Sequence, residues 1–328
     1  MKKIGLKKIV SLVCVMLVLS MALAAFAGCT EKKKYTVGIC QYTPHVALDA
    51  ATQGFIDALK EELGEENIEF INKDAGGEAN VCTTIVNDLV TKKVDLIMAN
   101  ATPALVAAVN ATDTIPVLGT SVTEYGTALE IDNFDGLVGG NVSGTSDLAP
   151  LDQQAQMILD LFPEAKTVAM LYCMAEENSK YQVKVVTEYL QKNGITVIDK
   201  AFTDSNDVNS VAAAAAAEAD VIYVPTDNKA ADCAEAIGGI IGDTPLIAGE
   251  EGICKGAGVA TLTISYYDLG VATGKMAAKI LKGEAKIEEM KIEYSKTFTK
   301  KYNKARCNQL GIDTAALEAL GYVAIDET

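Results

Sequence analysis

Short apolar runs alternate with helical segments through most of the chain. The run 36–40 has the character of a strand, and after it apolar residues recur at the spacing of one helix face: Leu48, Ala51, Phe55, Leu59 and Leu63. Further apolar runs predict strands at 68–71, 96–99, 115–118 and 137–142, with helices around 78–92 and 102–112 between them. Near-continuous apolar strands that alternate with helices indicate a parallel sheet with helices on both sides.

The pattern of the first half returns in the second half. Residues 166–172 (KTVAMLY) echo 35–40 (YTVGIC), and residues 219–223 (ADVIY) echo 94–98 (VDLIM). The alanine-rich stretch 212–217 reads as an ordinary helix. This weak internal repeat predicts an α/β protein of two similar, doubly wound parallel-sheet lobes.

The first 28 residues have the composition of an export signal. A basic start is followed by an almost wholly apolar run at 9–25, and Phe26-Ala27-Gly28 then supplies small residues just before Cys29. This order predicts a lipoprotein signal peptide over 1–28, lipidation of Cys29 and a linker over 29–34. Because Phe26 stands where an aliphatic residue is usual, ordinary signal cleavage or a retained anchor remain as alternatives. Each alternative puts the body of the protein outside the cytoplasm.

Charge and cysteine content narrow the function classes. The formal net charge of −16 at pH 7 argues against nucleic acid and other polyanionic partners. The six cysteines beyond Cys29 are widely spaced, without a CxxC motif, and the only histidine is His45, so zinc and redox motifs have no support. Buried single thiols are favoured over structural disulfides, although an exported protein can pair them. The chain also lacks GxSxG and a glycine-rich phosphate loop, which argues against an enzyme and against a cofactor.

Polar side chains gather where the predicted strands end. Open α/β sheets bind ligands beyond the carboxyl ends of their strands, and two such lobes facing each other make a cleft. The loops at those ends are rich in hydroxyls, carboxylates and tyrosines: 41–45, 100–103, 120–125, 143–147, 173–179, 225–228 and 249–252.

Seven short segments carry a resemblance to a known family. They are 48–51 (LDAA), 101–104 (ATPA), 146–150 (SDLAP), 177–179 (ENS), 224–228 (VPTDN), 266–270 (YYDLG) and 273–278 (TGKMAA). In this order they resemble the extracytoplasmic substrate-binding lipoproteins of ABC importers, in the group that includes tryptophan and other aromatic amino-acid binders. The segments span nearly all of the mature chain, so the resemblance is specific although each segment alone is weak.

The resemblance implies the type I periplasmic-binding-protein fold, in which three crossings form a hinge between two lobes. We expect crossings near 146, 264 and 297, with lobe one formed by 35–146 and 265–297 and lobe two by 147–264 and 298–328. Residues 302–312 resemble the last helix of the family. Two departures, Pro44-His45-Val46 in place of Glu-His-Pro and Ser265 in place of an aspartate, leave the ligand open.

The implied function is to bind a small solute, an aromatic amino acid by the resemblance, and to deliver it to an ABC permease in the membrane. We expect a monomer that meets membrane lipid through Cys29 and has no nucleic-acid partner. Two alternatives stay open: a receptor that presents the same ligand to a membrane sensor, and a sugar-binding protein of the same fold. The sugar alternative is weaker, because the chain has no Trp and only seven Phe for stacking on sugar rings.

A zwitterionic amino acid needs an anion site, a cation site and a shaped side-chain pocket. The single arginine, Arg306, lies near the C-terminus, so helix N-termini are expected to hold the carboxylate. Cap-like pairs stand at Thr102-Pro103, Asn178-Ser179 and Thr226-Asp227, and each of them can also act only as a helix cap. The acidic candidates for the ammonium are Asp147, Glu177, Asp227 and Glu251, and the tyrosines that can stack on an aromatic ring are Tyr42, Tyr125, Tyr172 and Tyr266.

His45 is expected either to form part of the pocket wall or to cap a helix, and Tyr223 is expected in the core because it lies within a strand. The complete set of predicted ligand-binding residues is Gln41, Tyr42, His45, Thr102, Ser121, Ser146, Asp147, Tyr172, Asn178, Ser179, Thr226, Asp227, Glu251 and Tyr266.

Overall fold

The computed structural model describes residues 34–325 of the chain. The predicted signal peptide over 1–28, the lipidation site Cys29 and the linker up to residue 33 lie outside the described residues. Within the described part, none of the helices combines the length and the apolar character that a membrane span requires.

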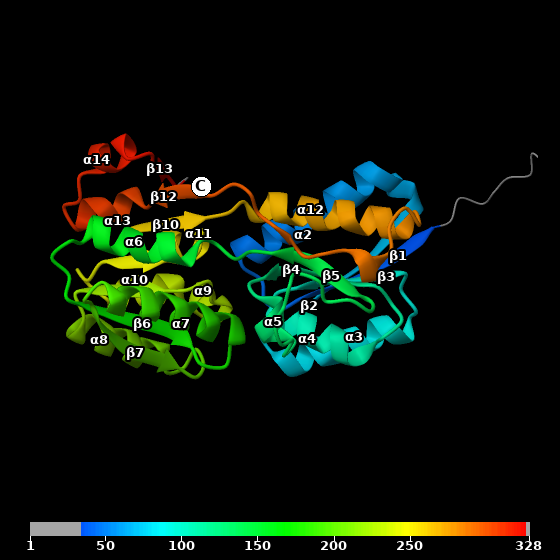
Figure 1. Ribbon diagram of the computed structural model, residues 1–328, viewed down its shortest axis with the longest axis horizontal. Helices are drawn as coiled ribbons and strands as arrows, with labels where there is room; N and C mark the ends of the chain where they lie inside the picture. Colours follow the sequence, from blue (N-terminus) through cyan, green and yellow to red (C-terminus); the bar gives the residue numbers. More distant parts are fainter. Residues whose placement is uncertain (1–33, 326–328) are drawn as a thin grey trace, which may run out of the picture. The chain divides into compact units, whose positions relative to one another are not determined.

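Two separate sheets organise the described residues, and each belongs to one lobe (Figure 1). The sheet of lobe one has the strand order β11-β5-β4-β3-β1-β2, and that of lobe two has the order β13-β12-β10-β9-β8-β6-β7. The first five strands of each lobe therefore follow the same order, 2-1-3-4-5, which is the flavodoxin-like doubly wound arrangement. The predicted fold class of two doubly wound α/β lobes is confirmed, and the common order accounts for the internal repeat of the sequence.

The elements of lobe one are β1 (Tyr35–Gln41), α2 (Val46–Leu63), the 3-10 turn η1 (Glu65–Asn67), β2 (Ile68–Asp74), α3 (Ala79–Thr91), β3 (Leu96–Asn100), α4 (Thr102–Ala111), β4 (Val117–Val122), α5 (Tyr125–Ala128), β5 (Val142–Ser146), α12 (Tyr266–Leu281), η2 (Ile287–Glu289) and β11 (Glu293–Tyr294). All pairings within this sheet are parallel.

The elements of lobe two are α6 (Leu151–Leu161), β6 (Thr167–Cys173), α7 (Glu177–Lys192), β7 (Thr196–Phe202), α8 (Val208–Glu218), β8 (Val221–Val224), α9 (Asn228–Asp232), α10 (Ala234–Ile240), β9 (Leu246–Ala248), α11 (Glu251–Gly256), β10 (Ala260–Thr263), β12 (Thr299–Tyr302), α13 (Lys304–Gln309), α14 (Thr314–Ala319) and β13 (Val323–Ala324). One pairing differs from the parallel pattern, because β12 runs antiparallel to β10.

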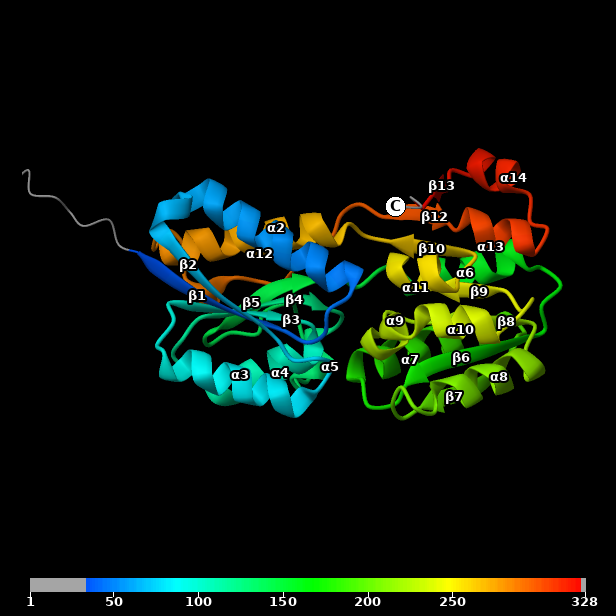
Figure 2. The same ribbon diagram turned by 180° about the vertical axis from the view of Figure 1, so that it is seen from behind.

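Apolar residues on both faces of the strands explain the layers. In β6, Val168 and Met170 pack with α6 and α7 on one face, whereas Ala169 and Leu171 pack with α8 on the other. In lobe one, α2 and α12 cover one face of the sheet, and α3 and α4 cover the opposite face (Figure 2). Successive side chains of a strand point to opposite faces, so a strand between two helix layers is apolar throughout.

Close packing of α2 on α12 joins segments that are far apart in the sequence. A Cβ atom added at Gly270 would lie 1.9 Å from the carbonyl oxygen of Ala51, and one added at Gly54 would lie 2.1 Å from the carbonyl oxygen of Tyr267. Only glycine permits this approach of the two backbones. The N-terminus of α12, which carries Tyr266, is thereby fixed against α2.

The chain passes between the lobes three times: from β5 to α6, from β10 to α12, and from β11 to β12 (Figure 1). The bounds of the two lobes in the sequence stay a prediction.

Two predicted elements are wrong in part. The strand expected over 137–142 begins only at Val142, because Gly139 and Gly140 adopt positive φ angles in a turn. The helix expected over 302–312 begins at Lys304, because Tyr302 ends β12.

The six cysteines within the described residues are free thiols: Cys40, Cys82, Cys173, Cys233, Cys254 and Cys307. All of them are buried except Cys233, which is half-buried. They behave as small apolar side chains of the two cores, as the sequence favoured.

Candidate functional site

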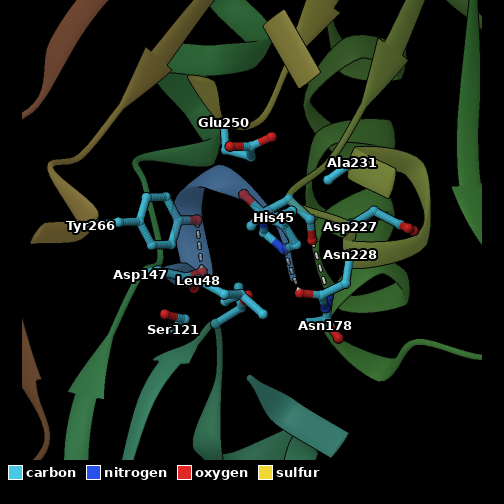
Figure 3. Close-up of a pocket in the computed structure, with 12 residues that line it drawn as sticks. His45, Leu48, Ser121, Asp147, Asn178, Asp227, Asn228, Ala231, Glu250 and Tyr266 are labelled. Carbon is cyan, nitrogen blue, oxygen red and sulfur yellow. Dashed lines mark hydrogen bonds between the residues drawn. The ribbon is translucent and has the colours of Figure 1, made fainter. Parts of the chain in front are cut away.

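A small cavity lies between the lobes, at the carboxyl ends of their strands (Figure 3). This is the position that doubly wound sheets use for ligands. Its lining comes from the end of β4, from the loops after β1, β4, β5, β8 and β9, and from the first turns of α2, α7, α9 and α12. It consists of His45, Leu48, Ser121, Thr123, Asp147, Asn178, Thr226, Asp227, Asn228, Ala231, Glu250 and Tyr266.

Seven of the fourteen predicted ligand-binding residues line this cavity. They are His45, Ser121, Asp147, Asn178, Thr226, Asp227 and Tyr266. Figure 3 shows Tyr266 beside Asp147 on one side of the cavity and His45 beside Asn228 on the other. The fold thus brings residues as far apart in the sequence as His45 and Tyr266 together around one cavity.

Asp147 is a buried carboxylate, and one of its two oxygens has no hydrogen-bond partner within the described residues. The hydroxyl of Tyr266 donates to Asp147 Oδ2 over 3.0 Å, whereas Asp147 Oδ1 has no hydrogen-bond partner in the described residues. Burial raises the pKa of Asp147 to about 6, the hydroxyls of Thr123 and Tyr266 oppose this shift, and the negative charge of Glu250 adds to it. A cationic group placed in the cavity would satisfy the free oxygen and favour the ionised carboxylate.

Two further polar atoms of the lining are buried without a partner. Ser121 Oγ and Asn178 Oδ1 make no hydrogen bond within the described residues. Ser121 has a φ angle of 53°, an uncommon conformation for a non-glycine residue and one that clusters at functional sites. The Asn178 amide is fixed, because its Nδ2 donates to Glu176 Oε2 and to the carbonyl oxygen of Thr226, each over 3.0 Å. Its acceptor oxygen therefore remains available to a ligand.

Asp227 lines the cavity and also caps α9. It accepts hydrogen bonds from the Ala230 N–H over 2.8 Å, from the Cys173 N–H over 2.7 Å and from the Ser179 hydroxyl over 2.7 Å. Burial raises the pKa of Asp227, and these donors counteract the shift. The predicted cap at Asp227 is confirmed, and the predicted residue Ser179 supports it from outside the cavity lining.

Glu250, which the sequence prediction missed, takes the place in the cavity that was expected for its neighbour Glu251. Glu250 lines the cavity and caps α11, accepting from the N–H groups of Gly252 and Ile253. The predicted Glu251 lies outside the lining and pairs with Lys301 over 2.6 Å, since it occupies the first turn of the helix rather than the cap. Burial raises the pKa of Glu250. An acid at the last position before a helix was the signal that could have identified it.

Neither the predicted Glu177 nor its neighbour Glu176 lines the cavity, but Glu176 is buried beside it. Glu176 accepts from the Asn228 N–H and the Lys229 N–H, each over 3.1 Å, and thereby holds the start of α9. Burial, followed by the charge of Asp227, raises the pKa of Glu176 to about 8. Glu177 is instead exposed and paired with Lys180 over 2.7 Å. Carboxylates of the protein thus already occupy the N-terminus of α9, so the expectation that the helix start at Thr226-Asp227 holds a ligand carboxylate is wrong. The helix starts at Thr102-Pro103 and Asn178-Ser179 stay predictions.

The remaining predicted residues lie outside the cavity lining. Gln41 bonds to Thr52 and Asp49, Ser146 Oγ donates to the carbonyl oxygen of Thr123, and the Tyr172 hydroxyl donates to Asp199.

Thr102 is the first residue of α4 and not its cap, which is Ala101, and Tyr42 lies under the ammonium of Lys229 at 5.9 Å. Tyr125 and Tyr223 are core residues, since each is fully buried and donates its hydroxyl to another core group.

The lining is rich in acceptors and poor in cations. Among its twelve described residues there is no Lys and no Arg. The single arginine, Arg306, is bonded to the carbonyl oxygen of Thr244 and to Gln309 in lobe two. No group of three potential metal ligands occurs within residues 34–325. The site therefore suits a small ligand that brings its own hydrogen-bond donors.

Two α/β lobes that enclose a cavity at their strand ends define a solute-binding protein. Residues 36–320 match the family model described as ABC transporter substrate binding protein, and the chain belongs to this family. It is a binding protein and not an enzyme, as the sequence indicated, and proteins of this family are extracytoplasmic. A leucine binding protein from Thermotoga maritima, at 14% identity, shares the type I periplasmic-binding-protein fold alone, with a TM-score of 0.57 over 77% of this chain and 84% of that one.

Closer relatives are also found. The chain is 34% identical over 259 residues to a tyrosine-binding protein of Clostridioides difficile, covering 78% of this chain and 75% of that protein. A domain from Streptococcus pneumonia in complex with L-Trp is 30% identical with a TM-score of 0.84, covering 89% of this chain and all of that one. The ligand-free, open structure of an adhesive substrate-binding protein from Clostridium difficile is 35% identical but has a TM-score of 0.68, covering 89% and 100%.

Proposed function

We propose that this chain is an extracytoplasmic lipoprotein that binds an aromatic amino acid between its lobes and delivers it to the permease of an ABC importer. The observation that carries the proposal is the set of unpartnered polar atoms in the cavity, Ser121 Oγ, Asp147 Oδ1 and Asn178 Oδ1. An amino acid supplies an ammonium for the acceptors and a carboxylate for the hydroxyl. Asp147 follows a strand of lobe one and Asn178 a strand of lobe two, so one ligand contacts both lobes and favours closure.

The chemistry of the lining supports a division of roles. The ammonium goes to Asp147, with Asn178 as a second acceptor, because these atoms are otherwise unsatisfied and buried. The carboxylate goes to the hydroxyl of Ser121, because the Thr123 hydroxyl is bonded to Asp147 and acids of the protein already occupy the N-termini of α9 and α11. Tyr266 has the flat surface that packs against an aromatic ring. The named ligands of the relatives, tyrosine and L-Trp, support the aromatic class.

A calorimetry panel tests the ligand class. Purified residues 30–328 are titrated with the amino acids and with several sugars, and we expect binding of at least one of Trp, Tyr and Phe. The absence of binding to all three contradicts the aromatic assignment, whereas binding of a sugar instead favours the sugar-binding alternative.

Closure and oligomeric state follow from two solution measurements. Small-angle scattering is expected to show compaction when a saturating ligand is added, and an unchanged curve contradicts a closing hinge. Light scattering coupled to size exclusion is expected to give the mass of a monomer. A dimer contradicts that part of the proposal.

The lipid anchor and the permease need experiments in cells. The full chain is expected in the membrane fraction, and Cys29→Ala is expected to release it without loss of ligand binding. A Cys29→Ala variant that remains in the membrane contradicts lipidation at this residue. Uptake of the bound amino acid that requires both this protein and an ABC permease supports delivery, and activation of a sensor kinase without uptake supports the signalling alternative.

A further inference from the structure

Beyond the cavity, a second set of contacts joins the two lobes. The hydroxyl of Thr43, in the loop after β1, donates to Asp232 Oδ2 over 3.0 Å, and Asp232 Oδ1 lies 3.3 Å from the same hydroxyl. Asp232 is the last residue of α9 in lobe two and stands 189 positions along the chain from Thr43. Neither residue belongs to the cavity lining. Opening of the lobes must break this hydrogen bond.

Both partners are held in place before they meet. On lobe one, the Tyr42 N–H donates to the carbonyl oxygen of Asn100 over 3.1 Å, and the Gly77 N–H donates to the carbonyl oxygen of Tyr42 over 2.8 Å. The hydroxyl of Thr43 is therefore presented by a fixed loop, and the residue is 2% exposed. Because the donor is already ordered, formation of the bond across the lobes loses little conformational entropy.

On lobe two, α9 connects the cavity to this contact. Its N-cap, Asp227, lines the cavity, and Glu176 holds its first N–H groups. Its other end carries Asp232. A movement of the lobe-two wall of the cavity therefore also moves Asp232 relative to Thr43.

Neighbouring contacts strengthen the same junction. The Lys229 ammonium lies 5.9 Å from the centre of the Tyr42 ring, and a Cβ atom added at Gly77 would lie 2.7 Å from Lys229 Nζ. His45 Nε2 lies 3.3 Å from Asn228 Oδ1. The loops of lobe one at 42–45 and 76–77 thus meet a single helix of lobe two. His45 and Asn228 also line the cavity, whereas Tyr42, Gly77 and Lys229 lie outside its lining.

We propose that Thr43 and Asp232 form a latch between the lobes, which stabilises the closed arrangement and sets the affinity for every ligand without contacting any ligand. The effect on affinity rests on the proposed function, whereas the latch itself does not. Since the bond adds to closure whatever fills the cavity, its loss must weaken all ligands by the same factor. A residue that contacts the ligand would instead change the ranking of ligands.

The test uses Thr43→Val, which removes the hydroxyl at nearly constant volume, together with Asp232→Ala and the double variant. Thr43→Ser keeps the donor and serves as the matched control. We expect Thr43→Val to weaken binding of each amino acid by a common factor of about three- to tenfold. This factor is smaller than the loss of a buried hydrogen bond to a charged group would give, because Asp232 is exposed to solvent. The double variant is expected to bind no more weakly than Asp232→Ala alone, and Thr43→Ser is expected to bind as the unmodified protein. Unchanged affinity, or factors that differ between ligands, overturns the latch.

A second measurement separates this proposal from the proposed function. If no amino acid binds at all, the proposed function fails, and the latch is then decided by denaturant unfolding of the four ligand-free proteins. Non-additive losses of unfolding free energy from Thr43→Val and Asp232→Ala support the latch. Additive losses, in the absence of any ligand, overturn it.

Discussion

Asp147 offers a test in which one carboxyl group controls two properties with opposite pH dependence. The perturbation is Asp147→Asn, which keeps the size of the side chain and removes its charge. Asp147 is 4% exposed, and burial raises its pKa from 3.8 to about 6. The folded protein therefore holds a proton that the unfolded chain releases over this pH range.

The stability effect follows from the two pKa values. A raised pKa gives the folded state an advantage that is fully present below pH 4 and is lost as the pH rises through 6. The separation between 3.8 and about 6 corresponds to about 3 kcal/mol of unfolding free energy. Relative to Asp147→Asn, the unmodified protein is thus expected to lose about 3 kcal/mol between pH 4 and pH 7. Denaturant unfolding of both proteins, followed by circular dichroism, measures this difference. The contributions of the other buried acids to the unfolding free energy are common to both proteins and cancel in the comparison.

The binding effect has the opposite sign, because the ligand ammonium requires the ionised carboxylate. Affinity of the unmodified protein is expected to be constant above pH 6 and to fall below it, by up to about tenfold per pH unit. Asp147→Asn is expected to bind about 10 to 100 times more weakly at pH 7, the loss of a charge-assisted hydrogen bond, and to show no such dependence.

Asp152→Asn is the matched control for both measurements, since this exposed carboxylate in the first turn of α6 stands five residues away from Asp147. It is expected to follow the unmodified protein. Parallel pH profiles of unfolding and of binding in Asp147→Asn and the unmodified protein would refute the reasoning.

Three further predictions concern packing, the two glutamates and the thiols. Gly270→Ala is expected to lower the unfolding free energy by about 1 to 3 kcal/mol in denaturant titration, because α2 and α12 must move apart; Gly239→Ala, with open space at its Cβ, is the control and should not destabilise. Glu250→Gln is expected to weaken binding by calorimetry more than Glu251→Gln, and the reverse order would contradict the place of Glu250 in the cavity. In folded residues 30–328, Cys233 is expected to react with a thiol reagent before the five buried thiols. After denaturation all six thiols are expected to react, and fewer than six would indicate a disulfide.

The sequence by itself determined the fold and the region of the site. Apolar runs such as 96–99 are long enough for a strand and apolar on both faces, which only a sheet between two helix layers accommodates. Since ligands of such sheets bind at the strand ends, the loops after the strands were identifiable too, and Asp147, Asp227 and Tyr266 were among their residues.

Only the tertiary structure decided which side chains in those loops face the cavity. Glu250 and Glu251 are the same residue type and differ only in position, since Glu250 is the N-cap of α11 and Glu251 is its first residue. No periodic pattern in the sequence fixes the residue at which this helix begins. The Thr43–Asp232 bond joins residues 189 positions apart, and no local signal connects them. Hydrophobic periodicity reports which elements form, whereas the direction of single polar groups at their ends depends on how the two lobes close on each other.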